Sequence, residues 1–273
     1  MSTRAQQYAA TVVDRQPLSP HLVRIVLDVP DFVSTDIPDE WVGLVVPGQF
    51  QSRYYTVRSY AEGRLTLDVV VHDVGLVTEW ARREESGGPG GPGGIVGETV
   101  TITEPKGSFE LPASAQWLLL VGDLTALPAM ARIAESVELP TRIWAEVPDV
   151  EELRGYLPAG PSVAEVTWLP QPRDGESRLA EVVEGIDWPE GEGYFWMAGE
   201  SAQMRAIRKH LMREVRLPSH AYDVMGYWRA NAQRQPRAVD PGPVWRAGKA
   251  AGLSDEQIWA NYDAAQQAQA GQQ

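Results

Sequence analysis

The first 113 residues hold short segments in which apolar and polar positions alternate, a pattern typical of strands with one buried face. Each segment is rich in Val, Ile, Thr or Tyr and is bounded by Pro, Gly or Asp. The segments are residues 7–18, 21–29, 53–60, 64–72 and 98–105. One helical pattern, residues 76–86, precedes the last of them. This order predicts a small antiparallel β-barrel or β-sandwich.

Beyond Leu111 the pattern changes to strands and helices that take turns. Residues 116–123, QWLLLVGD, form a continuous apolar run, which is typical of a strand buried on both faces. Further strands are expected at 141–147, 163–169 and 193–200, and helices at 125–138, 150–157, 178–186 and 202–215. The alternation predicts a doubly wound parallel sheet.

A Gly/Pro run, GGPGGPGG at residues 87–94, separates the helical pattern from the last strand of the first part. It lacks the Lys-Ser/Thr of a phosphate-binding loop and does not lead into a helix. Gly and Pro together disfavour both helix and sheet, so we expect a mobile surface loop.

The end of the chain, residues 231–273, is first loose and rich in Pro, Gln and Ala. A helix is then expected from Ser254, which forms a capping box with Gln257. Its apolar face carries Ile258, Trp259 and Tyr262, and we expect it to fold back onto the body. The expected domains are residues 1–113, 114–230 and 231–273.

Composition excludes several classes of function. The 273 residues include 24 Lys and Arg against 37 Asp and Glu, a net charge of −13 that disfavours nucleic acid and anionic membranes as partners. No segment approaches the ~20 apolar residues of a membrane helix, and we expect a cytoplasmic protein. There is no cysteine, and the four histidines have no metal-site spacing, so we expect no protein metal centre and expect redox chemistry to need an organic cofactor.

Two turns at strand ends are candidates for a nucleotide site. Gly122 and Gly199 each follow an apolar strand, where backbone amides can face a ligand. Asp123 stands where a dinucleotide fingerprint has its second Gly; a carboxylate there disfavours a phosphate and favours a ribose hydroxyl or an adenine edge, with Thr125 beside it. A purely structural turn explains each glycine equally well.

The segment RYYTVRSY, Arg53 to Tyr60, is polar on both strand faces. Taken alone, an edge strand with solvated arginines explains it. However, RYYTVRSY, VHDVGLVTEWA, EPKGSF, LLLVGDLTALPAMARI, YFWMAGESAQMRAIRKHL and GYWR, in this order between Tyr8 and Arg229, resemble the siderophore-interacting proteins. These are flavin-dependent ferric siderophore reductases of the ferredoxin reductase-like superfamily. The resemblance implies a Greek-key FAD-binding barrel, an NAD(P)H-binding α/β domain and a chelated ferric substrate.

The resemblance also assigns site residues, position by position. It places Arg53 on an FAD phosphate and Tyr55 and Thr56 on the isoalloxazine and ribityl parts. Further flavin contacts are implied for His72, Gly75, Val77 and Thr78, with Thr78 capping the following helix, and for Asp123, Thr125 and Ala126 near the adenosine. The nicotinamide and substrate cleft is implied to involve Arg58, Gly199, Glu200, Tyr227, Trp228 and Arg229. The alternatives are a ligand-free strand end for His72, core packing for Trp228 and a solvated position for Arg58.

The implied reaction passes electrons from NADH or NADPH through FAD to siderophore-bound Fe(III). The alternatives are a flavoenzyme for another acceptor, such as free flavin, a quinone or an electron carrier, and a non-redox binder of ferric siderophores. Only three lysines are present, Lys106, Lys209 and Lys249, so a neutral or cationic hydroxamate complex suits this acidic chain better than an anionic catecholate. Glu146 favours NADH, while Arg173 supports NADPH. A ferredoxin remains a second possible donor, and we expect a monomer.

Overall fold

The computed structural model describes residues 6–49, 51–72, 75–84, 94–172 and 176–229. The chain divides into two compact units, residues 1–230 and 231–273, and the fold below is that of the first. The predicted tail helix lies outside the described residues, as do Arg173 and residues 87–93 of the Gly/Pro run.

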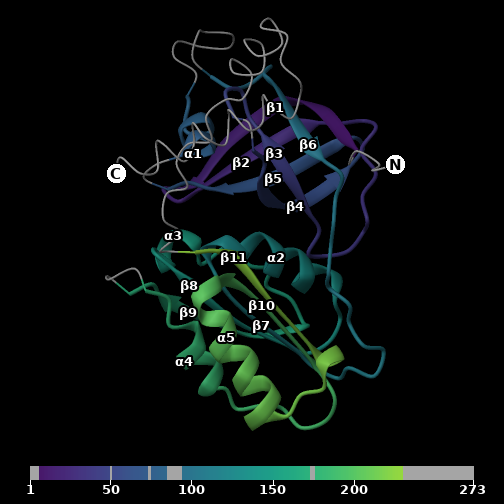
Figure 1. Ribbon diagram of the computed structural model, residues 1–273, viewed down its shortest axis with the longest axis vertical. Coiled ribbons are helices and arrows are strands. Elements are labelled where there is room, and N and C mark those ends of the chain that lie inside the picture. Colours follow the sequence, from purple (N-terminus) through teal and green to yellow (C-terminus); the bar gives the residue numbers. More distant parts are fainter. Residues whose placement is uncertain (1–5, 50, 73–74, 85–93, 173–175, 230–273) are drawn as a thin grey trace, which may run out of the picture. The chain divides into compact units, whose positions relative to one another are not determined.

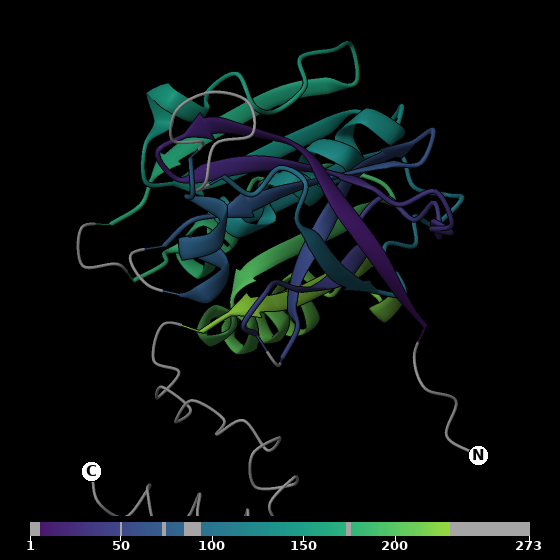
Figure 2. The same cartoon turned by 90° about the horizontal axis from the view of Figure 1, so that it is seen from above.

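The first part of the chain is a closed, six-stranded antiparallel barrel with strand order β1-β2-β5-β4-β3-β6 (Figures 1 and 2). Strands β3, β4 and β5 are neighbours in sequence order and β2 returns beside β5, which is a Greek key. The barrel and the Greek-key topology confirm the expectation. The strands are β1 Gln7–Ser19, β2 Leu22–Asp28, β3 Trp41–Val45, β4 Arg53–Ala61, β5 Arg64–Val70 and β6 Thr99–Thr103, with helix α1, Leu76–Ala81, between β5 and β6.

The barrel interior is filled by the apolar half of each alternating strand. Ile25, Val57, Leu67 and Ile102 are fully buried, and Tyr55 packs against the edge of this core. Burial of each aliphatic side chain stabilises the fold by about 1.5–3 kcal/mol. Period-two alternation in the sequence therefore decides which side of each strand faces inward.

The second part is a five-stranded parallel sheet of order β11-β10-β7-β8-β9. Its strands are β7 Leu118–Asp123, β8 Thr141–Val147, β9 Val163–Pro170, β10 Tyr194–Glu200 and β11 Tyr222–Trp228. The chain passes from β7 outward to β9 and then crosses to β10 on the other side of β7. This reversal places a topological switch point between β7 and β10, where ligands bind in such sheets.

Helices cover both faces of this sheet, as a doubly wound fold requires (Figure 1). Leu118 and Leu120 of β7 pack on one face, and Leu119 and Val121 pack on the other. The first face holds α2 Leu127–Ser136 and α3 Val150–Leu153, and the second holds α4 Leu179–Glu184 and α5 Ser201–His210. Short helical turns complete the chain: η1 Leu124–Ala126, η2 Leu211–Val215 and η3 Ser219–Ala221.

Two strands, β3 and β11, were not predicted from the sequence. Each contains a glycine. Gly43 lies in β3, where an added Cβ would meet Ser52 Cβ at 2.9 Å and Thr103 Cγ2 at 3.0 Å. Gly226 lies in β11, where an added Cβ would clash with Ser201. In a sequence, a glycine usually indicates a turn. In these two strands a glycine is present because a neighbouring residue packs too closely to leave room for a side chain.

Two adjacent buried carboxylates, Asp39 and Glu40, connect the barrel to the sheet. Asp39 Oδ1 accepts hydrogen bonds from the backbone N–H groups of Ser108 and Phe109 at 2.8 and 2.9 Å, and Oδ2 accepts from Trp196 Nε1 of β10 at 3.4 Å. Glu40 is fully buried and pairs with Arg132 of α2, with Oε1 to Nη1 at 3.3 Å. The junction is therefore polar, and both of its carboxylates are fully buried.

Candidate functional site

The motif Arg53-Tyr54-Tyr55-Thr56 forms the first half of β4. Arg53 is exposed, and its guanidinium makes no ion pair or hydrogen bond with another described residue, although its backbone pairs with β3. Tyr54 is 69% exposed. Burial raises the pKa of the Tyr55 phenol to about 12, against the opposing effect of the Arg53 guanidinium, so the ring is neutral at physiological pH. Thr56 is buried. A free guanidinium thus stands beside a neutral aromatic ring.

The barrel ladder opens beside this motif. Strand β4 pairs with β3 from Arg53 to Thr56, but with β5 only from Val57 onward. No described ladder contact joins residues 53–56 to β5. Strand β4 continues to Ala61, with a register shift against β5 between Val57 and Ser59. The opening leaves a backbone edge where a planar ligand can lie.

The loop after β5 is closed by one hydrogen bond. The backbone N–H of His72 donates to Thr78 Oγ1 at 3.1 Å. Gly75, with φ of 138°, is the N-cap of α1, and no side chain caps that helix. The expectation that Thr78 caps α1 is therefore wrong: Thr78 lies inside the helix and its hydroxyl faces back towards the strand end. Val77 belongs to the barrel core. His72 itself has further interactions.

Asp123, at the end of β7, has both carboxylate oxygens occupied by the protein. Oδ1 accepts from Thr125 N at 2.9 Å and from Thr125 Oγ1 at 2.6 Å, and Oδ2 accepts from Trp228 Nε1 at 2.5 Å. Burial raises the pKa of Asp123, and the hydrogen bonds from Thr125 and Trp228 oppose the rise. The carboxylate therefore caps η1 and fixes the indole of Trp228.

Gly122 allows the turn after β7 to pack closely. An added Cβ would meet Ala126 Cβ at 2.5 Å and the Ala198 carbonyl oxygen at 3.1 Å. Ala126 is fully buried against this point. The glycine thus brings the β7 turn and β10 together.

We expect Gly122→Ala to lower the free energy of unfolding by about 1–3 kcal/mol, because the new methyl overpacks this contact. Urea unfolding followed by tryptophan fluorescence measures the change. Gly160→Ala is the matched control, since an added Cβ there meets nothing within 4 Å. Equal stability of the two variants would contradict the packing role.

The end of β11 brings the barrel motif and the β7 turn together. Burial raises the pKa of the Tyr227 phenol, whose oxygen has no hydrogen-bond partner among the described residues, and the Thr56 side chain is close enough to oppose the rise. The next residue, Trp228, is held by Asp123. Thr56 of the barrel therefore lies close to Tyr227, and Asp123 of the sheet is hydrogen-bonded to the next residue, Trp228.

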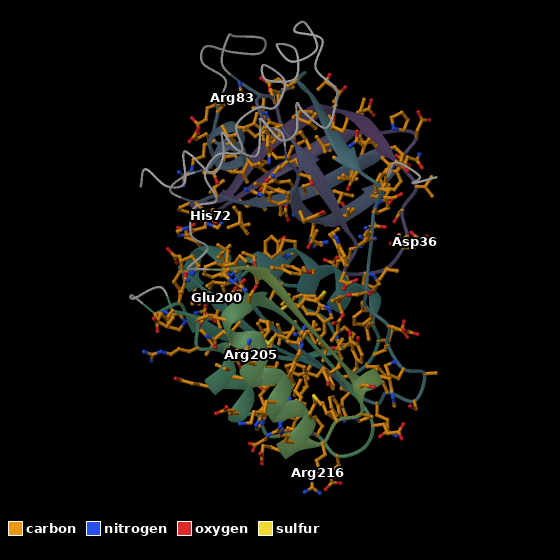
Figure 3. The ribbon with its side chains drawn as sticks, viewed as in Figure 1. Asp36, His72, Arg83, Glu200, Arg205 and Arg216 are labelled. Carbon is orange, nitrogen blue, oxygen red and sulfur yellow. The ribbon has the colours of Figure 1, made fainter. Side chains whose placement is uncertain are left out.

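The other residues predicted for the nicotinamide and substrate cleft lie partly beside Asp123 and Trp228 and partly elsewhere. Gly199 belongs to it, because an added Cβ there would lie 2.7 Å from Asp123 Oδ2. Glu200 is buried and ends β10 at the start of α5 (Figure 3). Arg229 is exposed just after β11. Arg58 is engaged elsewhere, by two hydrogen bonds of 2.7 and 2.6 Å to Glu135 of α2. Its side chain is 16% exposed, so it is not the solvated arginine of the alternative interpretation.

Sequence reasoning missed the buried carboxylates of the junction, Asp39 and Glu40.

No helix in the described ranges is long and apolar enough to cross a membrane. Within those ranges, no group of three or more His, Asp or Glu side chains is placed to hold a metal ion.

Comparison with known proteins agrees with this geometry. Residues 115–231 match the family model described as "Siderophore-interacting protein". The siderophore-interacting protein of Acinetobacter baumannii has the same fold, with a TM-score of 0.71 and 21% identity, covering 91% of this chain and all of that one. Residues 115–231 of this chain therefore carry a siderophore-interacting protein domain. The barrel and the doubly wound sheet are thus also the fold of that solved protein.

Two curated relatives carry related sequence. The mycobactin import ATP-binding/permease protein IrtA of Mycobacterium tuberculosis is 30% identical over 87% of this chain, which spans 28% of that protein. The ferric vibriobactin reductase ViuB of Vibrio cholerae is 29% identical over 65% of this chain and 64% of its own length. The chain therefore spans less than two thirds of each of these relatives.

Proposed function

We propose that this protein is a ferric siderophore reductase that passes electrons from NAD(P)H through FAD to chelated Fe(III). The observation that carries the proposal is the free guanidinium of Arg53 beside Tyr55 at the open ladder of β4. Arg53 is suited to a phosphate because its planar fork of donors is permanently charged. The name of the relative ViuB supports the same reaction type.

The residues present fit an FAD. Arg53 would pair with a phosphate, while the neutral ring of Tyr55 would pack against the isoalloxazine. The backbone at Gly75 is open, since an added Cβ there meets nothing within 4 Å. Thr56 would reach the ribityl side from the opposite strand face. Asp123, Thr125 and Trp228 would shape the wall of the site through their mutual hydrogen bonds rather than contact the adenosine.

FAD, when bound, accepts the two electrons of a nicotinamide hydride and can release them singly. One NAD(P)H therefore reduces two ferric complexes, giving NAD(P)⁺, two Fe(II) and one proton. The protein's own residues contribute position. Trp228, fixed by Asp123, and Gly199, with no side chain, define where the nicotinamide would lie at the switch point. We assign no residue as a general acid or base.

Iron would remain in the siderophore until it is reduced, because the chelator already fills its coordination sphere with hard oxygen ligands. These hold Fe(II) less tightly than Fe(III), so reduction releases the metal. A protein of net charge −13 slows the approach of a highly anionic complex. We therefore propose a neutral or cationic ferric trihydroxamate as the substrate. We further propose a cytoplasmic monomer, with a ferredoxin as a second possible donor.

The decisive experiment is an anaerobic reoxidation assay. The protein, loaded with FAD and photoreduced without any nicotinamide, is mixed with a ferric trihydroxamate or a ferric triscatecholate, and flavin absorbance and Fe(II) trapping are followed. We expect two Fe(II) per flavin and reoxidation at least tenfold faster with the trihydroxamate. Reoxidation by quinone or free flavin but by neither iron complex would identify a different acceptor, and a protein that binds no flavin would refute the proposal.

A further inference from the structure

A cavity of about 690 Å³ lies at the carboxyl ends of β8 and β9, beside the start of α4. Its walls are partly apolar and partly charged. They include Glu146, Leu169, Pro170, Arg178, Glu181 and Val182. Ligands of doubly wound sheets bind beyond the carboxyl ends of the strands, so this is the expected end of the sheet for a nucleotide.

Glu146, which ends β8, brings an unsatisfied buried carboxylate oxygen to this cavity. The residue is 3% exposed. Its Oε1 accepts a hydrogen bond from the backbone N–H of Arg178 at 2.9 Å, whereas Oε2 is buried with no hydrogen-bond partner among the described residues. Burial of an unpaired carboxylate oxygen is unfavourable, and such groups are rare outside functional sites. A ligand that donates a hydrogen bond would satisfy it.

The position of Glu146 in the sheet suits a ribose. Strand β8 is the second strand of the module and pairs directly with β7, whose turn borders the switch point. Neighbouring strands lie about 4.8 Å apart, so a nucleotide can extend from the switch point to β8. In parallel nucleotide-binding sheets, a carboxylate at the end of the second strand accepts the ribose 2′-hydroxyl of NAD.

The local charge disfavours a 2′-phosphate. Asp123 lies opposite Glu146 in the β7–β8 register, and Glu181 lines the same cavity. Burial raises the pKa of Glu146, and the nearby carboxylate of Asp123 adds to the rise, while the backbone N–H and the guanidinium of Arg178 and the side chain of Ser177 oppose it. Arg178 is the one cation among the described lining residues. A phosphate on the ribose would therefore place further negative charge against Glu146 and displace the hydroxyl that could donate to Oε2.

We propose that Glu146 accepts a hydrogen bond from the 2′-hydroxyl of an unphosphorylated adenosine ribose and so selects NADH over NADPH. The proposal rests on the proposed function for its choice of a nicotinamide nucleotide. It adds the identity of the electron donor and the residue that determines it.

The test is calorimetric titration of the full chain with ADP-ribose and with 2′-phospho-ADP-ribose, neither of which can reduce a flavin. We expect wild-type protein to bind ADP-ribose at least tenfold more tightly. Glu146→Gln should weaken the binding of ADP-ribose by about tenfold, because a hydrogen bond to a charged acceptor is lost. It should therefore also narrow the ratio of the two dissociation constants. Glu184→Gln, an equal change of charge at an exposed position of α4, should leave both values unchanged.

Equal or tighter binding of the 2′-phosphorylated ligand by wild-type protein overturns the proposal, as does absence of binding of both ligands. An unchanged ratio in Glu146→Gln also overturns it; a purely structural glutamate would give that result together with a lower melting temperature. Should Glu146→Gln not fold, the ratio of the two dissociation constants is compared between wild-type protein and Glu146→Asp. The aspartate withdraws the carboxylate by one methylene and should narrow the ratio in the same way. The photoreduced assay above needs no nicotinamide, so failure of either proposal is seen separately.

Discussion

Replacing Arg53 with alanine should weaken FAD binding by about ten- to a hundredfold, the loss expected for a charge-assisted hydrogen bond to a phosphate. Arg53 is exposed and has no ionic partner of its own in the described structure, so its removal leaves no buried group unpaired. Arg53→Lys should fall in between, because an ammonium keeps the charge but loses the planar fork. Titration of flavin-free protein with FAD, followed by quenching of flavin fluorescence, gives the dissociation constants.

Arg64→Ala is the matched control for this prediction. Arg64 lies at the other end of the same β4–β5 hairpin, is half-exposed and pairs with Asp28 at 3.2 Å. It should bind FAD as wild type does. Should Arg53→Ala and Arg64→Ala bind FAD equally well, the assignment of Arg53 to a phosphate would be refuted.

Replacing Arg132 with alanine should lower the free energy of unfolding by about 3–5 kcal/mol. Glu40, fully buried, would lose its cation while remaining in the junction, and the Val57 carbonyl would lose a donor now at 2.8 Å. Urea denaturation followed by tryptophan fluorescence reports the loss. Combining Arg132→Ala with Glu40→Gln should recover part of it, because the uncompensated charge is then removed.

The exposed pair Arg154–Glu151 provides the control for this second prediction. Its N–O distance is 2.8 Å, shorter than that of the buried pair, but its side chains are 62% and 81% exposed. Arg154→Ala should therefore cost less than about 1 kcal/mol. A similar loss from both arginine substitutions would show that burial does not control the strength of the Arg132 pair.

The order of strands and helices was predictable because it depends on local patterns. Alternation along β4 correctly separates Val57, inside the barrel, from Arg58, outside it. The uninterrupted apolar run of β7 correctly indicates a strand with helices on both faces. In each case the residues that decide the element are neighbours in sequence.

The strands β3 and β11 were not predictable in this way. Gly43 and Gly226 weaken the local strand signal, and the neighbours that require a glycine are brought near only by the folded chain. Asp39 and Glu40 were missed for a related reason. Within IPDEWV they have the composition of an ordinary polar turn, and Glu40 does accept local hydrogen bonds from Ser34 and Thr35. The partners that join them to the sheet, Trp196 and Arg132, are distant in sequence. Local sequence contains no signal for such contacts.

The site residues show the same division. The motif around Arg53 was found because its residue types are unusual for a strand, and Asp123 because it replaces a glycine at a strand end. The structure adds that both oxygens of Asp123 accept hydrogen bonds within the protein, from Thr125 and Trp228. Residue type and spacing identify a polar group at a site, but only its hydrogen bonds show whether it can still bind a ligand.

The junction at Asp39 and Glu40 has a consequence for motion. These adjacent residues reach two different elements of the sheet module, Trp196 in β10 and Arg132 in α2, and Asp39 also holds the connecting segment at Ser108 and Phe109. A hinge between the modules would have to break all of these buried interactions together. We therefore expect the barrel and the sheet to move as one rigid frame, so that a ligand can enter and leave without domain closure.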